Sequence, residues 1–422
     1  MKIWYITMKF PAPSETFAAN DIRALRRLGA KVSVHSLRGP WLGWEGLLQE
    51  RNLSNLEVTH GGVKSTFSGL CLSLKRPWVT LSLLVWLLRI CSTHPVHLAK
   101  SLLLIPRVVE LFVLLEREQP DVVHLFWGHY PSLFAFLVNK YRPNIVLTIF
   151  LGAYDLFREF PGTPDVAKQA DTVWTHAHFN INKIVSLGVP AQKIQVTYRG
   201  IDLSLIRAAD CPRVAHRLVS AGRMLPLKGM ETVLSAFRII RDQWSDATLV
   251  LLGEGPDRPR LEKLVCEWGL QDAVVFRGHV PHSEVFAEMA VAEVFLLLSR
   301  SGSERLPNAA KEAMASGCAC IVTDTDGIDE LITHGKSGFI VSQEVLPEEV
   351  AEIVSRFFVN AELRASFHSY ALEHLRERFD VDTSMRTYLE NWSLLLQQKS
   401  QAVAPVLMEN LNRPEAIVDR SA

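Results

Sequence analysis

The sequence predicts an α/β protein with two doubly wound parallel-sheet domains that face each other across a cleft. Short apolar runs alternate along the chain with amphipathic helical stretches, a pattern typical of parallel sheets covered by helices on both faces. The pattern restarts near residue 217, after the mixed stretch Asp202–Ala215, which we interpret as a linker. Ligands of such folds bind at the carboxyl ends of the strands, so the cleft is the expected site.

The first domain, residues 1–205, is expected to be Rossmann-like and to begin with a strand. The apolar run in MKIWYITMKF is too short and too mixed in polarity for a signal peptide. Thr16–Leu28 repeats apolar residues at helical spacing and is followed by Gly29, a helix-stop signal. The strands predicted here are Lys2–Thr7, Lys31–Ser36, Val122–Leu125, Ile145–Phe150, Thr172–Thr175 and Ile194–Thr197.

The second domain, residues 206–381, repeats the alternation, with a helix expected after each strand. Its predicted strands are Arg217–Ala221, Thr248–Leu252, Val274–Phe276, Val294–Leu298 and Ala319–Thr323. Residues 382–398 predict a last amphipathic helix that packs back on the first domain. Residues 399–422 are expected to form a flexible tail, and Ser400–Ala422 shows no periodic pattern.

Composition excludes several classes of protein. Lys and Arg total 45 and so do Asp and Glu, so the chain lacks the basic excess of a general nucleic-acid binder. A hydrophobic content of 48% excludes bulk disorder. No cysteine pair or nearby histidine has metal-ligand spacing, so we expect no metal. The uncharged run Trp78–Leu88 has eleven residues, fewer than the roughly 20 that a membrane-spanning helix needs.

One region is unusual in charge. Between Glu57 and Glu110 there is no acidic residue, whereas six basic ones occur among tryptophans and long apolar stretches: Lys64, Lys75, Arg76, Arg89, Lys100 and Arg107. A cationic amphipathic region of this kind can lie in the headgroup layer of an anionic membrane. Ordinary domain helices with a basic exposed face are the alternative. We therefore expect a cytoplasmic protein that binds peripherally at the inner face of the membrane through 64–107.

Three stretches of the second domain carry candidate chemistry. In SAGRMLPLKGM, Arg223 and Lys228 follow a strand and precede a helix, a place where two cations can bind a phosphate group. In LLGEGPDRPRLEKL, Gly253 and Gly255 begin a dinucleotide-type fingerprint, but Arg258 occupies the third glycine position, so the local pattern favours a tight strand-to-helix turn.

The third stretch is SRSGSERLPNAAKEAMASG. Pro307 suits a first helical position, and main-chain N–H groups near Asn308 would point at an anion. Glu304 can accept hydrogen bonds from sugar hydroxyls, and Glu312 can bind a ribose diol. Taken alone, two glutamates eight residues apart are common.

In combination these motifs resemble glycosyltransferase family 4, a retaining, nucleotide-sugar-dependent group with the GT-B fold. The motifs that carry the resemblance are, in order, FPAPSETF, VTYRGID, GRMLPLKG, a Gly-rich strand turn, FRGHVPHSEV, ERLPNAAKEAMASG and DGIDELITHGKSGFIV. The resemblance spans almost the whole chain and is strongest over 217–341. It is closest to members that build bacterial exopolysaccharide and lipid-linked glycans.

The resemblance implies that the first domain binds the acceptor and the second binds the nucleotide sugar. It implies that Arg223 and Lys228 neutralise the leaving diphosphate, that Glu304 lies beside the donor sugar and that Glu312 binds the ribose. The full donor site that it implies is Gly222, Arg223, Lys228, Gly278, His279, Val280, Glu304, Leu306, Pro307, Asn308 and Glu312. No cofactor is implied, because the two cations do the work that a divalent ion does elsewhere.

The chain departs from the family pattern at three positions. Arg305 follows the first glutamate where Gly is frequent, Leu151 precedes Gly152 where His is common, and Arg199 precedes Gly200 where Asn is frequent. The change at Leu151 removes the expected histidine contact to the donor sugar. Glu15, His129 and Asp155 are the acceptor-side candidates, and His129 or Asp155 could substitute for the missing histidine.

The sequence therefore predicts a hexosyltransferase-type enzyme that moves a sugar from a nucleotide diphosphate to a glycan or polyprenyl-linked acceptor. A GT-B-type sugar-nucleotide epimerase is one alternative, and a non-catalytic membrane- or glycan-binding protein with a degenerate site is the other. The epimerase would release nucleotide without any acceptor. Intact Arg223, Lys228, Glu304 and Glu312 favour the transferase over the binding protein.

Overall fold

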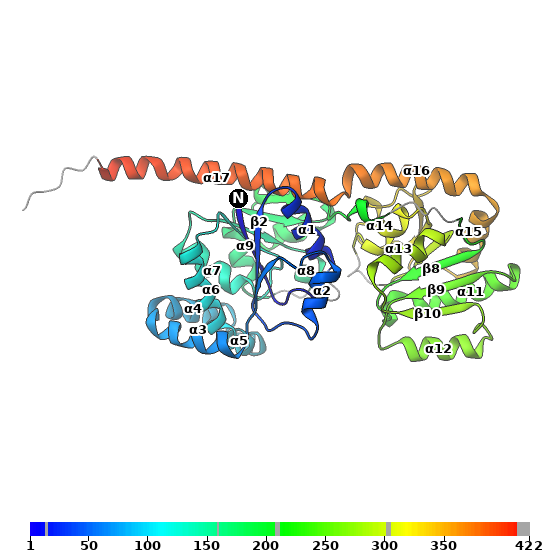
Figure 1. Ribbon diagram of the computed structural model, residues 1–422, viewed down its shortest axis with the longest axis horizontal. Coiled ribbons are helices and arrows are strands. Elements are labelled where there is room, and N and C mark those ends of the chain that lie inside the picture. The colour runs from blue at the N-terminus through cyan, green and yellow to red at the C-terminus, as the bar shows by residue number, and fades with distance from the viewer. Residues whose placement is uncertain (13–15, 158–159, 207–211, 301–304, 412–422) are drawn as a thin grey trace, which may run out of the picture.

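The computed structural model describes residues 1–12, 16–157, 160–206, 212–300 and 305–411, with only the backbone described over 402–411. It contains two entirely parallel sheets, one in each half of the chain (Figure 1). The first has the order β3-β2-β1-β4-β5-β6-β7 and the second the order β10-β9-β8-β11-β12-β13. The predicted fold class, two doubly wound α/β domains, is confirmed.

The predicted strands are present with small changes at their ends. The first sheet comprises β1 Lys2–Thr7, β2 Lys31–Ser36, β3 Glu57–Thr59, β4 Val122–Leu125, β5 Val146–Phe150, β6 Thr172–Thr175 and β7 Ile194–Val196. The second comprises β8 Arg217–Ala221, β9 Thr248–Leu252, β10 Val274–Gly278, β11 Val294–Leu297, β12 Ala319–Thr323 and β13 Gly338–Val341. The edge strands β3 and β13 were not predicted.

Helices cover both faces of each sheet. In the first half they are α1 Thr16–Arg27, α2 Trp44–Glu50, α3 Val63–Lys75, α4 Pro77–Ile90, α5 Pro95–Leu102, α6 Ile105–Glu118, α7 Ser132–Tyr141, α8 Ala153–Phe157, α9 Thr163–Gln169 and α10 Ile181–Ser186. In the second half they are α11 Met230–Gln243, α12 Arg258–Glu267, α13 His282–Val291, α14 Asn308–Ala315, α15 Pro347–Val359, α16 Ala361–Arg378 and α17 Val381–Leu411.

Successive side chains of a strand point to opposite faces of the sheet. Because helices cover both faces, both sets of side chains are buried. In β1, Trp4 and Ile6 belong to one apolar cluster, and Ile3 and Tyr5 belong to the cluster on the opposite face. The strands therefore read as continuous apolar runs, which is why the sequence located most of them.

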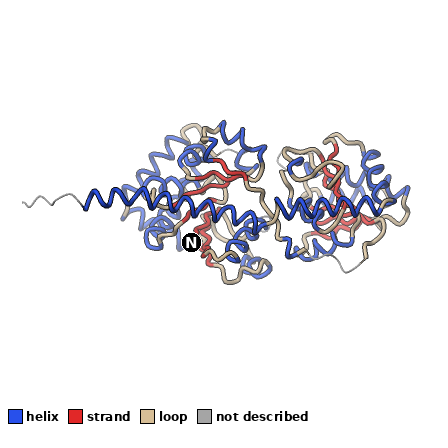
Figure 2. Tube along the Cα trace, turned by 90° about the horizontal axis from the view of Figure 1, so that it is seen from above, coloured by secondary structure: helices blue, strands red, loops and turns tan. Residues whose placement is uncertain are grey.

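The last helix returns to the first domain. Figures 1 and 2 show α16 lying along the second domain and α17 continuing along the first. The buried Trp392 donates a hydrogen bond from Nε1 to Thr148 Oγ1 of β5 at 3.1 Å. The helix continues to Leu411, past the predicted end at Gln398, and no glycine interrupts it over these residues. Residues 412–422 of the predicted tail lie outside the described residues.

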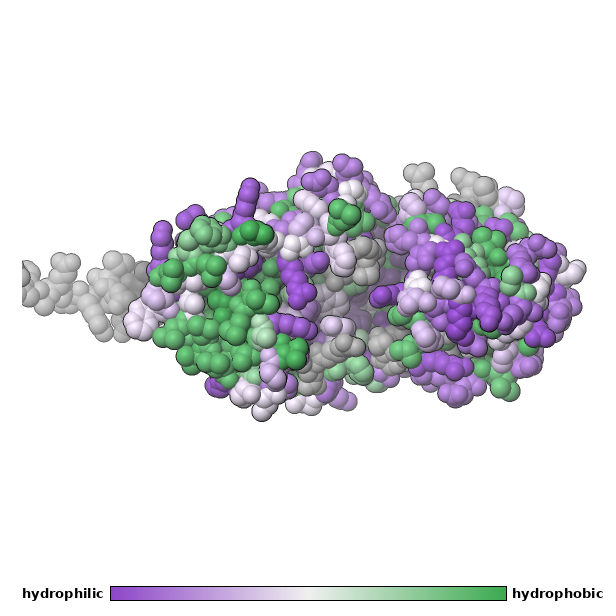
Figure 3. Space-filling model, turned by 90° about the horizontal axis from the view of Figure 1, so that it is seen from below, coloured by the Kyte–Doolittle hydropathy of each residue, from purple (hydrophilic) through white to green (hydrophobic). Residues whose placement is uncertain are grey.

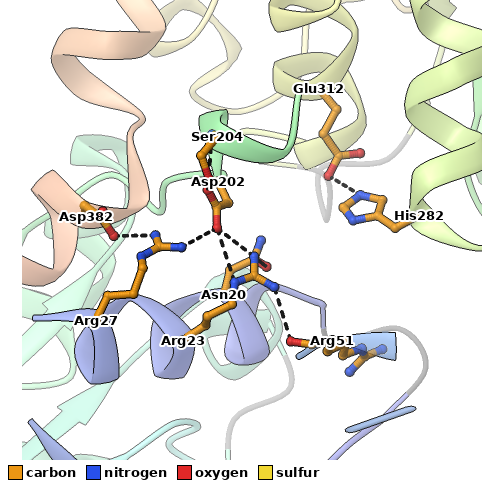
Figure 4. Close-up of polar contacts among 9 residues, drawn as sticks. All are labelled: Asn20, Arg23, Arg27, Arg51, Asp202, Ser204, His282, Glu312 and Asp382. Carbon is orange, nitrogen blue, oxygen red and sulfur yellow. Dashed lines mark hydrogen bonds and ion pairs between the residues drawn. The ribbon is translucent and has the colours of Figure 1, made fainter. Parts of the chain in front are cut away.

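The chain crosses between the domains twice, and the two crossings are hydrogen-bonded to each other. Ile201 donates its main-chain N–H to Phe379 at 2.9 Å, and Val381 donates to Ile201 at 3.1 Å. Asp202 beside them accepts hydrogen bonds from Arg23 and Arg27 of α1 (Figure 4). Burial acts to raise the pKa of Asp202, but the hydrogen bonds from Arg27 and Ser204 outweigh it and lower the pKa. The carboxylate therefore ties α1 to the first crossing.

Candidate active site

A cavity of about 510 Å³ lies between the two domains, at the carboxyl ends of β8, β9 and β10. Its volume falls within the roughly 300–1,000 Å³ of small-molecule sites. The residues that line it are Thr16, Leu47, Glu50 and Arg51 from the first domain, and Ala221, Gly222, Arg223, Leu252, Gly253, Glu254, Gly278, His279, Val280, His282, Val285, Asn308, Ala309 and Glu312 from the second. Seven of the eleven predicted donor-site residues are among them.

Close packing of the strand-end loops forms the floor of the cavity. Gly222 donates its N–H to the carbonyl of Leu252 at 2.9 Å, and Gly253 donates to Gly278 at 2.8 Å. Gly253 has φ +123°, and a Cβ atom there would lie 2.1 Å from the carbonyl oxygen of Gly222. Only glycine fits, so this residue serves the packing of the two loops, which accounts for the incomplete dinucleotide fingerprint.

The two predicted phosphate-binding cations lie in different surroundings. Arg223, directly after β8, is exposed and lines the cavity. Lys228 lies in the short 3-10 turn Pro226–Lys228 and does not line the cavity. Burial lowers the pKa of Lys228. The turn is fixed by Gly229, whose φ of +66° and contact with the carbonyl of Leu298 exclude any larger residue.

Glu312 is held by a histidine that the sequence analysis did not select. Its carboxylate is nearly buried on α14, and Oε1 lies 2.9 Å from His282 Nε2 (Figure 4). Burial acts to lower the pKa of His282, but the hydrogen bond to Glu312 and the charge of that carboxylate outweigh it and raise the pKa. His282 lies in the quoted motif FRGHVPHSEV, but only the structure places it opposite Glu312.

The predicted donor-site residues at the start of α14 lie in two different surroundings. Asn308 and Ala309 face the cavity with the N-terminal end of the helix, as expected for an anion site. Leu306 has φ +48°, and its side chain is buried in the apolar core. Pro307 is buried as well, so both residues shape the turn before α14, and neither lines the cavity. Glu304 lies outside the described residues.

A buried cluster of charges, also missed from the sequence, joins the domains behind the cavity. Arg199 lies over the rings of Phe17, Phe126 and Phe150, 4.0 to 4.7 Å from their centroids. Its Nε lies 3.6 Å from Asp21 Oδ2. Burial raises the pKa of Asp21 to about 6, although Arg199 and Lys311 act in the opposite direction. Arg199, which stands where the family often has Asn, thus packs against three aromatic rings. These rings are distant from it in sequence, so no local motif indicates the contact.

The acceptor-side candidates form a pair. His129 Nδ1 and Asp155 Oδ1 lie 3.3 Å apart, and the carboxylate of Asp155 also accepts the N–H groups of Gly128 at 2.9 Å and Gly152 at 3.1 Å. The Asp155 side chain is fully buried, so it joins the loops after β4 and β5 and positions His129. Neither residue lines the cavity. Leu151 is buried in the core, and Glu15 lies outside the described residues.

Comparison with known proteins agrees with this geometry. Residues 215–374 match the family model described as glycosyl transferases group 1. The chain is 28% identical over 372 residues to the putative colanic acid biosynthesis glycosyltransferase WcaL of Salmonella typhimurium, covering 81% of this chain and 87% of that protein. It is 26% identical over 366 residues to the amylovoran biosynthesis glycosyltransferase AmsK of Erwinia amylovora, with the same coverage.

The fold is similar to that of solved GT-B enzymes. The crystal structure of Anabaena Alr3699/HepE in complex with UDP superposes with a TM-score of 0.69 at 18% identity, covering 93% of this chain and 100% of that one. The two parallel-sheet domains thus have the GT-B fold. The match of residues 215–374 to the group 1 model and the similarity to the two exopolysaccharide glycosyltransferases confirm the predicted resemblance to a glycosyltransferase family.

Proposed function

We propose that this glycosyltransferase moves a hexose from a nucleoside-diphosphate sugar to a glycan or lipid-linked saccharide, with retention of anomeric configuration. The observation that carries the proposal is the cavity in which Arg223, the N-terminal end of α14 and the buried Glu312 meet. The UDP complex of the structural relative supports a nucleoside-diphosphate donor. The colanic acid and amylovoran enzymes support a role in bacterial exopolysaccharide or cell-surface glycan synthesis.

Each group in the cavity has a role in this proposal. Glu312 accepts hydrogen bonds from the ribose diol, while His282 fixes the orientation of its carboxylate. The main chain of Gly278–Val280 contacts the nucleobase, and Glu304 contacts the donor sugar. Arg223 and Lys228 stabilise the negative charge that develops on the leaving diphosphate, which is an electrostatic contribution to catalysis.

The proposed reaction exchanges one bond for another at the anomeric carbon. The bond to the leaving phosphate oxygen breaks, and a bond to the acceptor hydroxyl oxygen forms on the same face of the sugar. The acceptor proton passes to the leaving diphosphate, so the products are a glycoside and a nucleoside diphosphate. Exclusion of water from the cleft prevents hydrolysis of the donor.

Thermal-shift measurements with UDP, GDP, ADP and NAD test the donor site. A ligand at about 100 times its dissociation constant adds about 2.7 kcal/mol to the free energy of unfolding, which raises the melting temperature visibly. We expect one nucleoside diphosphate to give a clear shift, which Lys228→Ala reduces and Arg356→Ala, on α15 of the same domain, does not. A shift with NAD alone, or with none of the four, would contradict the proposal. Release of free nucleotide without any acceptor would favour the epimerase.

A further inference from the structure

The first domain carries a large apolar surface on α3, α4 and α5. Figure 3 shows it as a continuous hydrophobic area on the face seen from below. The exposed apolar residues of these helices and their ends are Val63, Phe67, Leu70, Leu74, Trp78, Leu81, Val85, Leu88, Val96, Leu102 and Leu103. We call this set the apolar face. Contiguous exposed surfaces of this kind mark protein or membrane interaction sites.

The apolar face consists of apolar residues that recur at helical spacing on the exposed sides of well-packed helices. Along α3, Val63, Phe67, Leu70 and Leu74 recur at helical spacing on the exposed side. The opposite side of α3 is anchored because the buried Gly69 lies against the main chain of Pro106, at the start of α6. The outward stripe therefore remains uncovered although the helix itself is firmly held.

Helix α4 is apolar all round, with one side for the core and one for the surface. Val79, Leu83, Trp86 and Leu87 are buried in the core of the first domain. The other side carries Trp78, which is 77% exposed, with Leu81, Val85 and Leu88. An all-round apolar helix belongs in a core or a membrane, so its exposed side requires an occupant.

No single helix among the described residues is long and apolar enough to cross a bilayer. Helices α3 and α4 pass that test as a pair, but they are bent by 103° at their junction. Both also pack on the domain through Gly69 and the buried side of α4. Their geometry thus favours lying in an interface over spanning it.

The charges around the apolar face select the kind of occupant. Lys64, Lys75 and Lys100 are exposed and make no ion pair with any described residue. Arg76 and Arg89 are also exposed, but they pair with Glu116 at 3.0 Å and Asp165 at 2.6 Å. Arg107 differs from the prediction because it is buried and bound to Glu110. The three unpaired lysines leave a net positive rim.

A positive rim disfavours a second copy of the chain as the occupant. A symmetric dimer would bring identical patches together, so the lysines of one copy would lie near those of the other without compensating carboxylates. An anionic bilayer provides both partners that the surface lacks: hydrocarbon for the apolar stripes and negative headgroups for the lysines. Trp78 at the surface suits the headgroup layer.

We propose that the apolar face docks the enzyme on the surface of an anionic lipid bilayer. The stripes of α3 and α4 enter the headgroup–acyl boundary, and Lys64, Lys75 and Lys100 contact the phosphates. Figure 3 shows that the hollow between the two domains opens on this same face of the molecule. Docking therefore leaves α17, which runs along the other side in Figure 1, in the aqueous phase.

Vesicle co-sedimentation tests this proposal with the full chain. We expect binding to vesicles of phosphatidylcholine mixed with phosphatidylglycerol, and much weaker binding to phosphatidylcholine alone. Replacing the three lysines by glutamine (K64Q, K75Q and K100Q) should lower the partition coefficient on the anionic vesicles about 100-fold, at roughly one order per one to two charges near the surface. The pair Leu74→Ser and Trp78→Ser should weaken binding to both kinds of vesicle.

A matched control separates the apolar face from general surface hydrophobicity. Leu346→Ser with Val359→Ser removes two exposed apolar residues of the second domain and should leave vesicle binding unchanged. The UDP thermal shift, measured without lipid, should be the same in every variant, so loss of folding or of the donor site is detected separately.

Three outcomes would overturn the proposal. One is absence of wild-type binding to the anionic vesicles, and another is equal binding by the three-lysine variant. The third is a lipid-free dimer, detected by light scattering, that Leu74→Ser with Trp78→Ser dissociates; the occupant of the apolar face would then be a second copy.

Discussion

Lys311 of α14 donates a hydrogen bond from Nζ to the main-chain carbonyl oxygen of Arg199 at 2.7 Å. This contact joins the helix that carries Glu312 to the segment before the first crossing between the domains. The ammonium is buried and also contacts Asn308 Oδ1 at 3.1 Å, at the rim of the cavity. The rim of the cavity and the inter-domain connection therefore share one side chain.

The protonation of Lys311 should make stability depend on pH in a defined window. Burial, with Arg199 nearby, lowers its pKa from 10.5 to about 7. Between these values the unfolded chain holds a proton that the folded chain lacks, so the free energy of unfolding rises with pH, by at most about 1.4 kcal/mol per pH unit. Lys311→Met should remove this slope in denaturant unfolding, whereas Lys263→Met, at an exposed position of α12, should retain it. Equal slopes in wild type and Lys311→Met would contradict the assignment.

The His282–Glu312 pair should make the free energy of unfolding fall as the pH rises, which is opposite to the effect of Lys311. The pKa of His282 is raised in the folded state, so its stabilising contribution is complete below the unfolded value near 6.5 and is lost as the pH rises through the higher folded value. His282→Gln should therefore reduce stability at acidic pH and leave it nearly unchanged at alkaline pH. Melting temperatures of the wild type and His282→Gln, measured from acidic to alkaline pH, test this prediction. A loss of melting temperature that is equal at all pH values would show that His282 contributes through packing alone.

Glu312 should also dominate the affinity for the nucleoside diphosphate. Removal of a hydrogen-bonded charged group costs about 1.5–3 kcal/mol, which corresponds to roughly 10- to 150-fold in affinity. We expect Glu312→Gln to weaken UDP binding by this factor in titration calorimetry, while Glu373→Gln, exposed on α16, has no effect. Unchanged affinity in Glu312→Gln would remove the residue from the donor site.

The catalytic contribution of Lys228 and Glu304 should appear in turnover. Replacing either by alanine should reduce the transfer rate at least about 100-fold, the scale of a lost electrostatic contact in the transition state. Arg356→Ala serves as the control for Lys228→Ala. Rates near that of the wild type, measured by release of nucleoside diphosphate in the presence of acceptor, would contradict the assignment of that residue.

Chelation should leave donor binding intact. Since Arg223 and Lys228 are proposed to neutralise the diphosphate, the thermal shift given by UDP should be the same in EDTA and in Mg²⁺. A shift that disappears in EDTA and returns with Mg²⁺ would show that a divalent cation takes part in binding.

The sequence predicts the fold well where burial is two-sided and poorly at the edges. The central strands are continuous apolar runs, but β3 consists of Glu57–Thr59, three residues that are partly exposed, and β13 begins at Gly338 after a turn. Val58 is the single apolar residue of β3, too few to indicate a strand, whereas the apolar run Phe339–Val341 of β13 has only three residues and directly follows the turn. The start of α17 was predicted because Val381, Met385, Tyr388 and Trp392 recur at helical spacing on one buried face.

Site residues in local motifs were predicted, whereas those that depend on partners distant in sequence were not. Arg223 and Glu312 belong to local motifs, so the sequence located them. His282, Arg199 and Lys311 act through partners that are distant in sequence, and their burial cannot be read from a single chain segment. Conversely, Leu306 lies within the motif but turns its side chain into the core because of its positive φ, which no residue pattern indicates.

The paired crossings at Ile201 and at Phe379–Val381 restrict how the cleft can change its width. Two hydrogen-bonded segments side by side define an axis: rotation of one domain about that axis preserves both hydrogen bonds, whereas sliding one domain past the other breaks them. Because α17 begins at the second crossing and is anchored along the first domain by Trp392, the second crossing is fixed to the first domain. The contacts of Ile201 and Lys311 thus hold the two walls of the cavity, which carry Arg51 and Arg223, against each other.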